Sequence, residues 1–172
     1  MPDPEPHIVI GATPEIYQAI GRVAEAWAHL EQATDWAIWE TALLNNDAGA
    51  CITSHLQSLN RRLQALMALI RLRLQDDNSV ILTRLNKFIG LTDGLAKERN
   101  RAVHDPWISV DDVPGRFQET AEKRLEFGFR PDTAERLLKL VDQINAAQQE
   151  LYSIKRAFEL SSHEKPSPPS SS

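Results

Sequence analysis

One short stretch of this chain, from Lys97 to His104, brings a guanidinium, an amide and an imidazole together at the end of a long helical pattern. Arg99 and Asn100 stand next to each other, and three residues separate Asn100 from His104. A guanidinium can hold a phosphate and stabilise negative charge that develops on it. An imidazole can take up or release a proton near neutral pH, and an amide can orient either partner. This combination indicates phosphate binding coupled to proton transfer.

Helix geometry gives Arg99 an unusual position for a charged residue. At about 100° per residue, it falls almost on the line of the preceding apolar residues Ile81, Leu85, Phe88 and Leu95. A charge on such a stripe needs a carboxylate, a carbonyl or a bound anion. Two interpretations follow: Arg99 holds an anion, or it pairs internally with an acid of the first helix, for which the candidates are Glu31, Asp35 and Glu40.

Four helical patterns make up most of the chain. The first is predicted to begin after the cap Thr13, with Pro14 at the first helical position. The third, which carries Arg99, is expected to stop near His104, because Pro106 disfavours helix in the residue before it. The expected ranges are 13–45, 52–75, 81–104 and 132–158, with a turn at 46–49, a break at 76–79 and Asp132 as the cap of the last helix.

Two segments after the third helix, 107–110 and 125–130, alternate or run apolar at strand spacing. They could form a small hairpin, with residues 111–124 as its loop. Residues 161–172 are rich in serine and proline and are predicted to be disordered. The sequence therefore predicts an all-α fold, an antiparallel bundle of four to five helices over residues 13–160, to which a short β-hairpin after the third helix could be added.

Composition and charge restrict the class of protein. The 172 residues, of which 42% are hydrophobic and 25% charged, suit one globular domain with a core. A net charge of −5 argues against a general nucleic-acid binder, although residues 51–75 contain four arginines and no acid. Residues 1–6 do not resemble a secretory signal, and no apolar run approaches about 20 residues. With Cys51 as the single cysteine, these features predict a soluble cytoplasmic protein without a membrane segment.

The chain offers little to a metal ion. Glu25 and His29 lie one helical turn apart and could bind a metal within a bundle. The Glu-x-x-His pairs expected of a di-iron bundle are absent from the sequence. A surface pair is the preferred interpretation of these two residues, and we predict neither a metal nor a cofactor.

The segment from Glu98 to His104 resembles the Arg-x(4–6)-His motif of HEPN domains (higher eukaryotes and prokaryotes nucleotide-binding). Arg99 matches the motif arginine, Asn100 the polar residue that often follows it, and His104 the motif histidine. The position of the motif at the end of a long helix also fits this family. The chain departs from the toxin subgroup whose histidine is followed by x-Tyr, because Pro106 stands in the place of the tyrosine.

This resemblance implies a helical bundle and a specific chemistry. Many HEPN proteins are metal-independent ribonucleases, among them toxins, anti-phage effectors and RNA-processing enzymes, and their active site is usually built from two copies in a dimer. The implied catalytic residues are Arg99, Asn100 and His104, and Lys97 and Arg101 would add contacts to the RNA backbone. The implied partners are RNA, a second copy of the chain, and an antitoxin or another protein. The alternative is a non-catalytic HEPN-like helical module that dimerises and binds a protein or a nucleotide.

Overall fold

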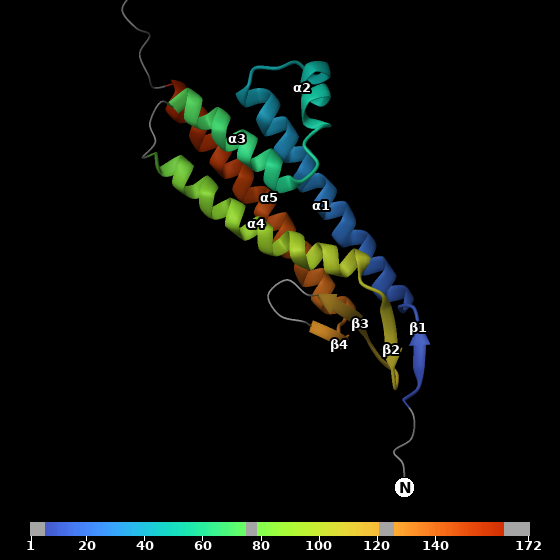
Figure 1. The fold of residues 1–172 in the computed structure, drawn as a ribbon. Helices are drawn as coiled ribbons and strands as arrows, with labels where there is room; N and C mark the ends of the chain where they lie inside the picture. Colours follow the sequence, from blue (N-terminus) through green and yellow to red (C-terminus); the bar gives the residue numbers. More distant parts are fainter. Residues whose placement is uncertain (1–5, 75–78, 121–125, 164–172) are drawn as a thin grey trace, which may run out of the picture. The chain divides into compact units, whose positions relative to one another are not determined.

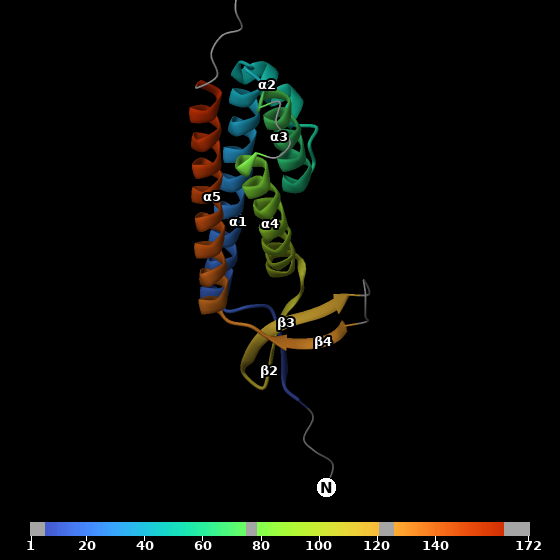
Figure 2. The same cartoon turned by 90° about the vertical axis from the view of Figure 1, so that its left-hand side faces the viewer.

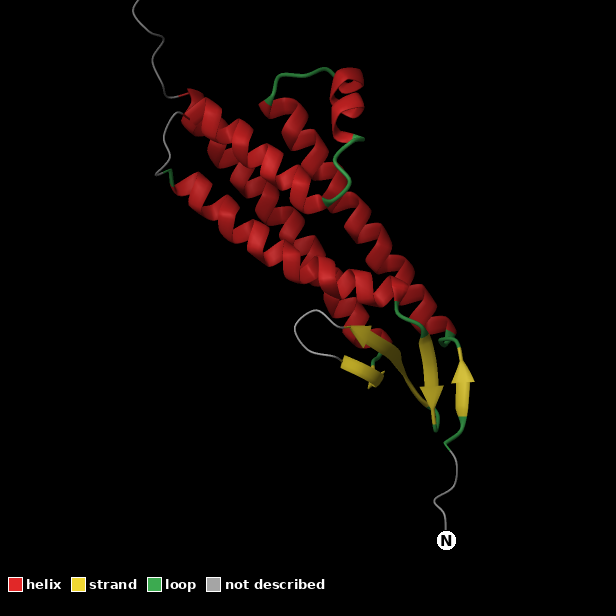
Figure 3. Ribbon diagram, viewed as in Figure 1, coloured by secondary structure: helices red, strands yellow, loops and turns green. Residues whose placement is uncertain are grey.

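The structure, a computed structural model, describes residues 6–74, 79–120 and 126–163. These residues are mostly helical and include a small antiparallel sheet (Figures 1 and 3). The predicted predominance of helix is confirmed. In place of the short hairpin that could follow the third helix, four of the described segments pair as a small antiparallel sheet. In chain order the described elements are β1 (Ile8–Ile10), α1 (Pro14–Thr41), α2 (Asn46–Thr53), α3 (Leu59–Leu74), α4 (Val80–His104), β2 (Trp107–Val110), β3 (Val113–Thr120), β4 (Glu126–Pro131) and α5 (Ala134–His163).

The chain divides into two compact units, and three long helices contribute to both. The unit that we call the sheet unit comprises residues 1–27 and 95–144, and it contains all four strands. The helical unit comprises residues 28–94 and 145–172. The first part of α1, the end of α4 and the start of α5 belong to the sheet unit. The stretch from Lys97 to His104 therefore lies in the sheet unit.

The helical unit buries an apolar stripe from each of its long helices. Leu30 of α1, Leu63 of α3 and Leu85 of α4 are fully buried, and α5 adds Leu151 and Ile154. On each helix the buried residues recur every three or four positions, so one continuous apolar face is directed inward. Full burial of one large apolar side chain contributes about 1.5–3 kcal/mol, and this shared core is what holds the helices of the unit together.

Residues 46–49, expected as a turn, form the start of α2 instead. Asn45 caps this helix, since its side-chain oxygen accepts a hydrogen bond from the Ala48 N–H at 2.9 Å. Gly49 is buried against the indole of Trp39, where a Cβ would lie 2.4 Å from the ring carbon Cγ. Asparagine and glycine are as typical of caps and close packing as of turns, so the local sequence did not distinguish the two.

Two further helix boundaries differ from expectation for local reasons. α1 ends at Thr41, before Leu43, which adopts a left-handed backbone with a φ of 56°. The single helix expected over 52–75 is divided, because α3 begins directly after Ser58, whose hydroxyl accepts a hydrogen bond from the Arg61 N–H at 3.3 Å. Residues 75–78, which include most of the expected break, lie outside the described residues.

The sheet has the strand order β1-β2-β3-β4, and each neighbouring pair is antiparallel. Figure 1 shows β1 beside β2, and Figure 2 shows β3 beside β4. Both segments expected as strands are strands, but the hairpin expected between them is wrong: β2 pairs with β3, which occupies part of the expected loop. Asp111 and Asp112, with φ of 49° and 65°, form the tight turn between β2 and β3.

The start of the last helix also differs in detail from the prediction. Thr133 rather than Asp132 caps α5, since the Thr133 hydroxyl accepts a hydrogen bond from the Arg136 N–H at 3.2 Å. The carboxylate of Asp132 is instead held by arginine side chains. At its other end α5 continues through Ser161 to His163, and residues 164–172 of the expected tail lie outside the described residues.

Candidate functional site at the end of α4

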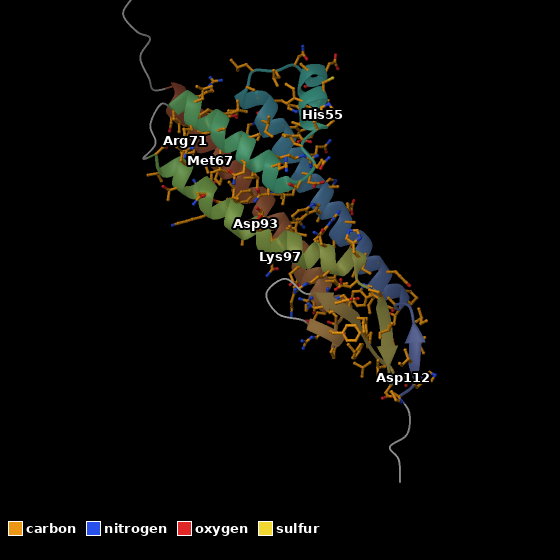
Figure 4. The ribbon with its side chains drawn as sticks, in the orientation of Figure 1. His55, Met67, Arg71, Asp93, Lys97 and Asp112 are labelled. Carbon is orange, nitrogen blue, oxygen red and sulfur yellow. The ribbon has the colours of Figure 1, made fainter. Side chains whose placement is uncertain are left out.

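The predicted site residues occupy the last turns of α4, where Figure 4 labels Lys97. The inward face of this helix continues through the motif, because Ala102 is buried between the polar positions. The apolar stripe expected along α4 is confirmed by the burial of Ile81, Leu85, Phe88 and Leu95. The helix is thus anchored by its apolar face, and the polar residues of the motif are distributed around the rest of its circumference.

Arg99 is partly buried and makes an unusual set of contacts. Its Nη1 donates a hydrogen bond to Asn100 Oδ1 at 2.9 Å. Its guanidinium carbon lies 5.9 Å from the ring centroid of Trp27, near the outer limit for a cation–π contact. Its Nε is buried and has no hydrogen-bond partner among the described residues. Part of the hydrogen-bonding capacity of this guanidinium is therefore unused, which is costly for a buried group.

The acids that were candidates for neutralising Arg99 are engaged with other bases. Glu31 and Asp35 lie 3.4 Å and 3.1 Å from nitrogen atoms of Arg62. Glu40 pairs with a lysine of α5. Within the described ranges, no carboxylate forms an ion pair with Arg99. The expected ion pair between Arg99 and an acid of the first helix is therefore not formed among the described residues.

Two other arginines provide a comparison for Arg99. The Nε atoms of Arg62 and Arg116 are also buried without a well-aligned hydrogen bond in the described part of the chain. Each of them nevertheless has a carboxylate oxygen close by, at 3.1 Å from Asp35 and at 2.8 Å from Asp132 respectively. Their charges are therefore compensated inside the protein, whereas the guanidinium of Arg99 contacts an amide and an aromatic ring and has no carboxylate partner among the described residues.

The remaining residues of the motif differ in their exposure and in their contacts with other side chains. Asn100 and His104 are exposed, and they lie one helical turn apart, so their side chains are neighbours. Lys97 is exposed (Figure 4). Arg101 is drawn toward Glu98, with 3.4 Å between the two charged groups. Arg101, which was predicted to contact an RNA backbone, is therefore already held within the chain.

The structure does not bring all three predicted catalytic groups to one side of the helix. Arg99 and Asn100 are joined by a hydrogen bond, and Asn100 neighbours His104 through helix geometry. Arg99 and His104 are five positions apart, which corresponds to about 140° around the helix axis. One copy of α4 therefore presents the guanidinium and the imidazole on different faces, with Asn100 between them.

A network of buried charges that the sequence did not reveal lies directly after the motif. The side chain of Arg116 on β3 is only 7% exposed and lies 3.5 Å from Asp105 and 2.8 Å from Asp132. The side chain of Asp132 is 1% exposed and also binds Arg136, at 2.6 Å. Because Asp105 follows His104 in the chain, this network fixes the exit from α4. Arg116 fell in a segment expected as a loop, so no pattern marked it.

The same network shifts the acidity of its carboxyl groups in opposite directions. Burial raises the pKa of Asp105, and the positive charge of Arg116 only partly opposes this effect. Burial also disfavours ionisation of Asp132, but hydrogen bonds from Arg136 and from the Thr133 N–H hold its pKa below the ordinary value. The hydrogen bond to Asp132 likewise raises the pKa of Arg136, which stays charged. Asp132 is therefore the anionic centre of the network.

A separate hollow of about 240 Å³ lies in the helical unit. Its charged groups are compensated within the chain: Lys155 pairs with Glu40 and Glu159, and Arg73 donates a hydrogen bond to the Thr41 carbonyl oxygen at 3.0 Å. None of the predicted site residues is among those that line it. This hollow therefore adds nothing to the chemistry expected from the motif.

The described residues contain no group of three or more histidine, cysteine, aspartate or glutamate side chains placed to hold a metal ion. Glu25 and His29, which lie one helical turn apart on α1 and could bind a metal, are both exposed. Across the same residues, none of the helices has the length and apolar character needed to cross a membrane.

Comparison with known proteins does not assign the chain to a family. No family model, no curated protein and no solved structure matches it. Any functional statement therefore rests on the residues of the chain itself, and above all on the seven from Glu98 to His104.

Proposed function

We propose that this protein is a metal-independent endoribonuclease that uses Arg99, Asn100 and His104, with the active site completed by the same residues of a second copy. The observation that carries the proposal is the environment of Arg99, whose partly buried guanidinium has no carboxylate partner in the described residues and retains an unsatisfied Nε. An RNA phosphate is an anion that a guanidinium can bind through two parallel hydrogen bonds. The HEPN-like spacing of the three residues supports the same assignment.

The proposed reaction needs no group beyond these side chains. The 2′-hydroxyl of RNA attacks the adjacent phosphorus, its proton passes to an imidazole, and the bond to the 5′-oxygen breaks as that oxygen takes up a proton. His104 of the copy opposite the bound phosphate would accept the first proton and, as an imidazolium, would then supply a proton to the departing 5′-oxygen. Arg99 would bind the phosphate oxygens as their negative charge grows, and Asn100 would orient the phosphate or the imidazole.

A composite site also accounts for the angular separation within one helix. Because Arg99 and His104 lie about 140° apart around α4, a single copy cannot easily direct both at one phosphate. Two copies that face each other could combine Arg99 and Asn100 of one helix with His104 of the other. The net charge of −5 limits the remaining attraction for RNA, so we expect weak binding that depends strongly on salt.

The alternative function is a non-catalytic HEPN-like module that binds a protein or a nucleotide. Two observations favour it: the amide oxygen of Asn100 is already occupied by Arg99, and Arg101 is held by Glu98. In that case Arg99 would still bind an anion, but His104 would transfer no proton.

Cleavage of RNA by the purified protein in the presence of EDTA tests the proposal. The variants are His104→Ala and Arg99→Met, and the matched controls are His55→Ala and Arg61→Met, which alter an exposed histidine and an exposed arginine of the helical unit. We expect the controls to match the wild type and the two site variants to lose at least about 100-fold in rate.

The variants should keep the fold, which separates chemistry from stability. Methionine retains the apolar part of Arg99 beside Trp27 and removes a buried Nε without a partner, so thermal unfolding should move by only a few degrees. Unchanged cleavage by His104→Ala would rule out the proposed mechanism. An inactive wild type that still binds RNA or a nucleotide, with binding lost in Arg99→Met, would instead support the non-catalytic alternative.

A further inference from the structure

β1 forms one edge of the sheet, and its outer side is open. The strand order β1-β2-β3-β4 leaves no described strand beside it on that side (Figure 3). All three of its residues are exposed, Ile8 by 57%, Val9 by 47% and Ile10 by 90%. An apolar edge of this kind is a template for pairing with another strand.

The hydrogen bonds to β2 show which backbone groups of β1 point outward. The Asp111 N–H donates to the His7 carbonyl oxygen and the Gly11 N–H donates to the Trp107 carbonyl oxygen, each at 2.9 Å. Val9 is aligned with Ser109 midway between these two pairs. In an antiparallel ladder the bonding side alternates from one residue to the next. The backbone N–H and C=O groups of Ile8 and Ile10, which flank Val9, therefore face the open edge.

Beyond Ile8 and Ile10, the next outward-facing positions of the chain offer no free backbone N–H. The next outward position before Ile8 is Pro6, which has no backbone N–H to donate. The next outward position after Ile10 is Ala12, whose N–H already donates to the Tyr17 hydroxyl at 3.2 Å. The available donors and acceptors are thus those of Ile8 and Ile10, placed symmetrically about Val9.

The opposite edge of the same sheet, formed by β4, is protected against the addition of another strand. β4 carries Arg130 and ends at Pro131, and Gly128 within it has a φ of 138°. A charge, a proline and a distorted backbone are devices that discourage strand addition. β1 has no charged residue and no proline within its three positions.

We propose that β1 is a self-association surface, on which β1 of a second copy pairs in antiparallel fashion about a two-fold axis at Val9. Ile8 of one copy would face Ile10 of the other, and each such pair would exchange two hydrogen bonds. The same patch then serves both copies, as a two-fold interface requires. The two four-stranded sheets would become one continuous sheet.

The small size of the surface sets its strength. Two three-residue strands bury far less than the roughly 1,200 Å² of a stable standard interface, so the dimer should form only at high protein concentration. Strand spacing and register would put the two Trp107 Cα atoms about 20 Å apart. This pairing therefore does not itself merge two copies of the Lys97–His104 stretch into one cleft, and it does not rest on the proposed nuclease activity.

Sedimentation equilibrium over a range of concentrations tests the pairing. The variants are Ile10→Lys, which places a charge at the contact, and Ile8→Pro, which removes an outward N–H that no bond within the sheet uses. The matched control is Leu72→Lys, at an exposed leucine of the helical unit. We expect the average mass of the wild type and of the control to rise toward that of a dimer, and the average mass of both edge variants to rise clearly less at the same concentrations.

A disulfide gives a positive test of the register. At a two-fold axis Val9 faces itself in a pair without mutual hydrogen bonds, with the two Cα atoms about 4.5 Å apart, a distance that a disulfide can bridge. In a Cys51→Ala background, oxidation should link Val9→Cys into a covalent dimer far faster than Tyr17→Cys. A wild type that stays monomeric, association that is equally strong in the wild type and in both edge variants, or equal cross-linking of the two cysteine variants would overturn the pairing. Loss of RNA cleavage in any of these proteins bears only on the nuclease proposal.

Discussion

Asp132→Asn is the substitution whose effect the structure defines best, because it removes the charge at the centre of a buried network. The Asp132 side chain is 1% exposed and lies 2.8 Å from Arg116 Nε. It also receives hydrogen bonds from Arg136 Nε at 2.6 Å and from Arg136 Nη2 at 2.9 Å. Asparagine has nearly the same shape, so the change tests the charge rather than the packing.

The expected cost comes mainly from Arg116. Removing one partner of a buried ion pair destabilises a protein by about 3–5 kcal/mol, because the other charge is left buried and uncompensated. Arg116 would keep Asp105, at 3.5 Å, and Arg136, whose side chain is 48% exposed, would be rehydrated. We therefore expect the lower end of this range, about 3 kcal/mol. For a chain of this length that corresponds to a fall in Tm of about 6–12 °C.

The pH dependence of the difference provides an internal check. The pKa of Asp132 is lowered in the folded protein from its usual value of 3.8. A carboxyl group with a depressed pKa contributes stability that is complete above its unfolded value and is lost as the pH falls through the folded value. The gap in Tm between the wild type and Asp132→Asn should therefore stay constant from pH 7 to about pH 5 and shrink below about pH 4.

Two further variants test whether an uncompensated Arg116 causes the loss of stability. Arg136→Met removes an exposed partner and should lower stability by about 1 kcal/mol or less. The double variant Asp132→Asn with Arg116→Met removes both buried charges and should be more stable than Asp132→Asn alone. Urea unfolding followed by circular dichroism measures all four proteins. An Asp132→Asn protein within about 0.5 kcal/mol of the wild type, or a double variant that is less stable than the single one, would refute an uncompensated Arg116 as the cause.

Two other substitutions test the packing of each unit by chemical denaturation. Gly49→Ala should destabilise by about 1–3 kcal/mol, because the new Cβ would lie 2.4 Å from Trp39 Cγ. Its control, Gly21→Ala in α1, has no heavy atom within 4 Å of the new Cβ and should stabilise by about 0.5–1 kcal/mol; equal effects at the two sites would contradict the contact. Trp107→Phe should cost about 1–3 kcal/mol, since the Trp107 indole donates to the buried Ala102 carbonyl oxygen at 3.0 Å, and an unchanged urea midpoint would count against that bond.

The sequence could locate the candidate site but not its partners. The spacing of apolar residues predicted α4, and Pro106 predicted its end near His104; α4 does end at that residue. The pattern could not say whether Arg99 meets a carboxylate, because its candidate partners belong to a different helix. The structure pairs those acids with other bases and leaves Arg99 with Asn100 and Trp27.

What the sequence by itself determined are the features set by neighbours along the chain: the long helices, the effect of Pro106, and the order of chemical groups from Lys97 to His104. Only the tertiary structure decided the pairing of β2 with β3, the exposure of β1, and the burial of Arg116 and Asp132. Helical periodicity arises from contacts three and four residues apart, so a short stretch of sequence is enough to specify it. Strand pairing and ion pairing join residues distant in sequence, and no local pattern specifies which of several compatible partners will meet.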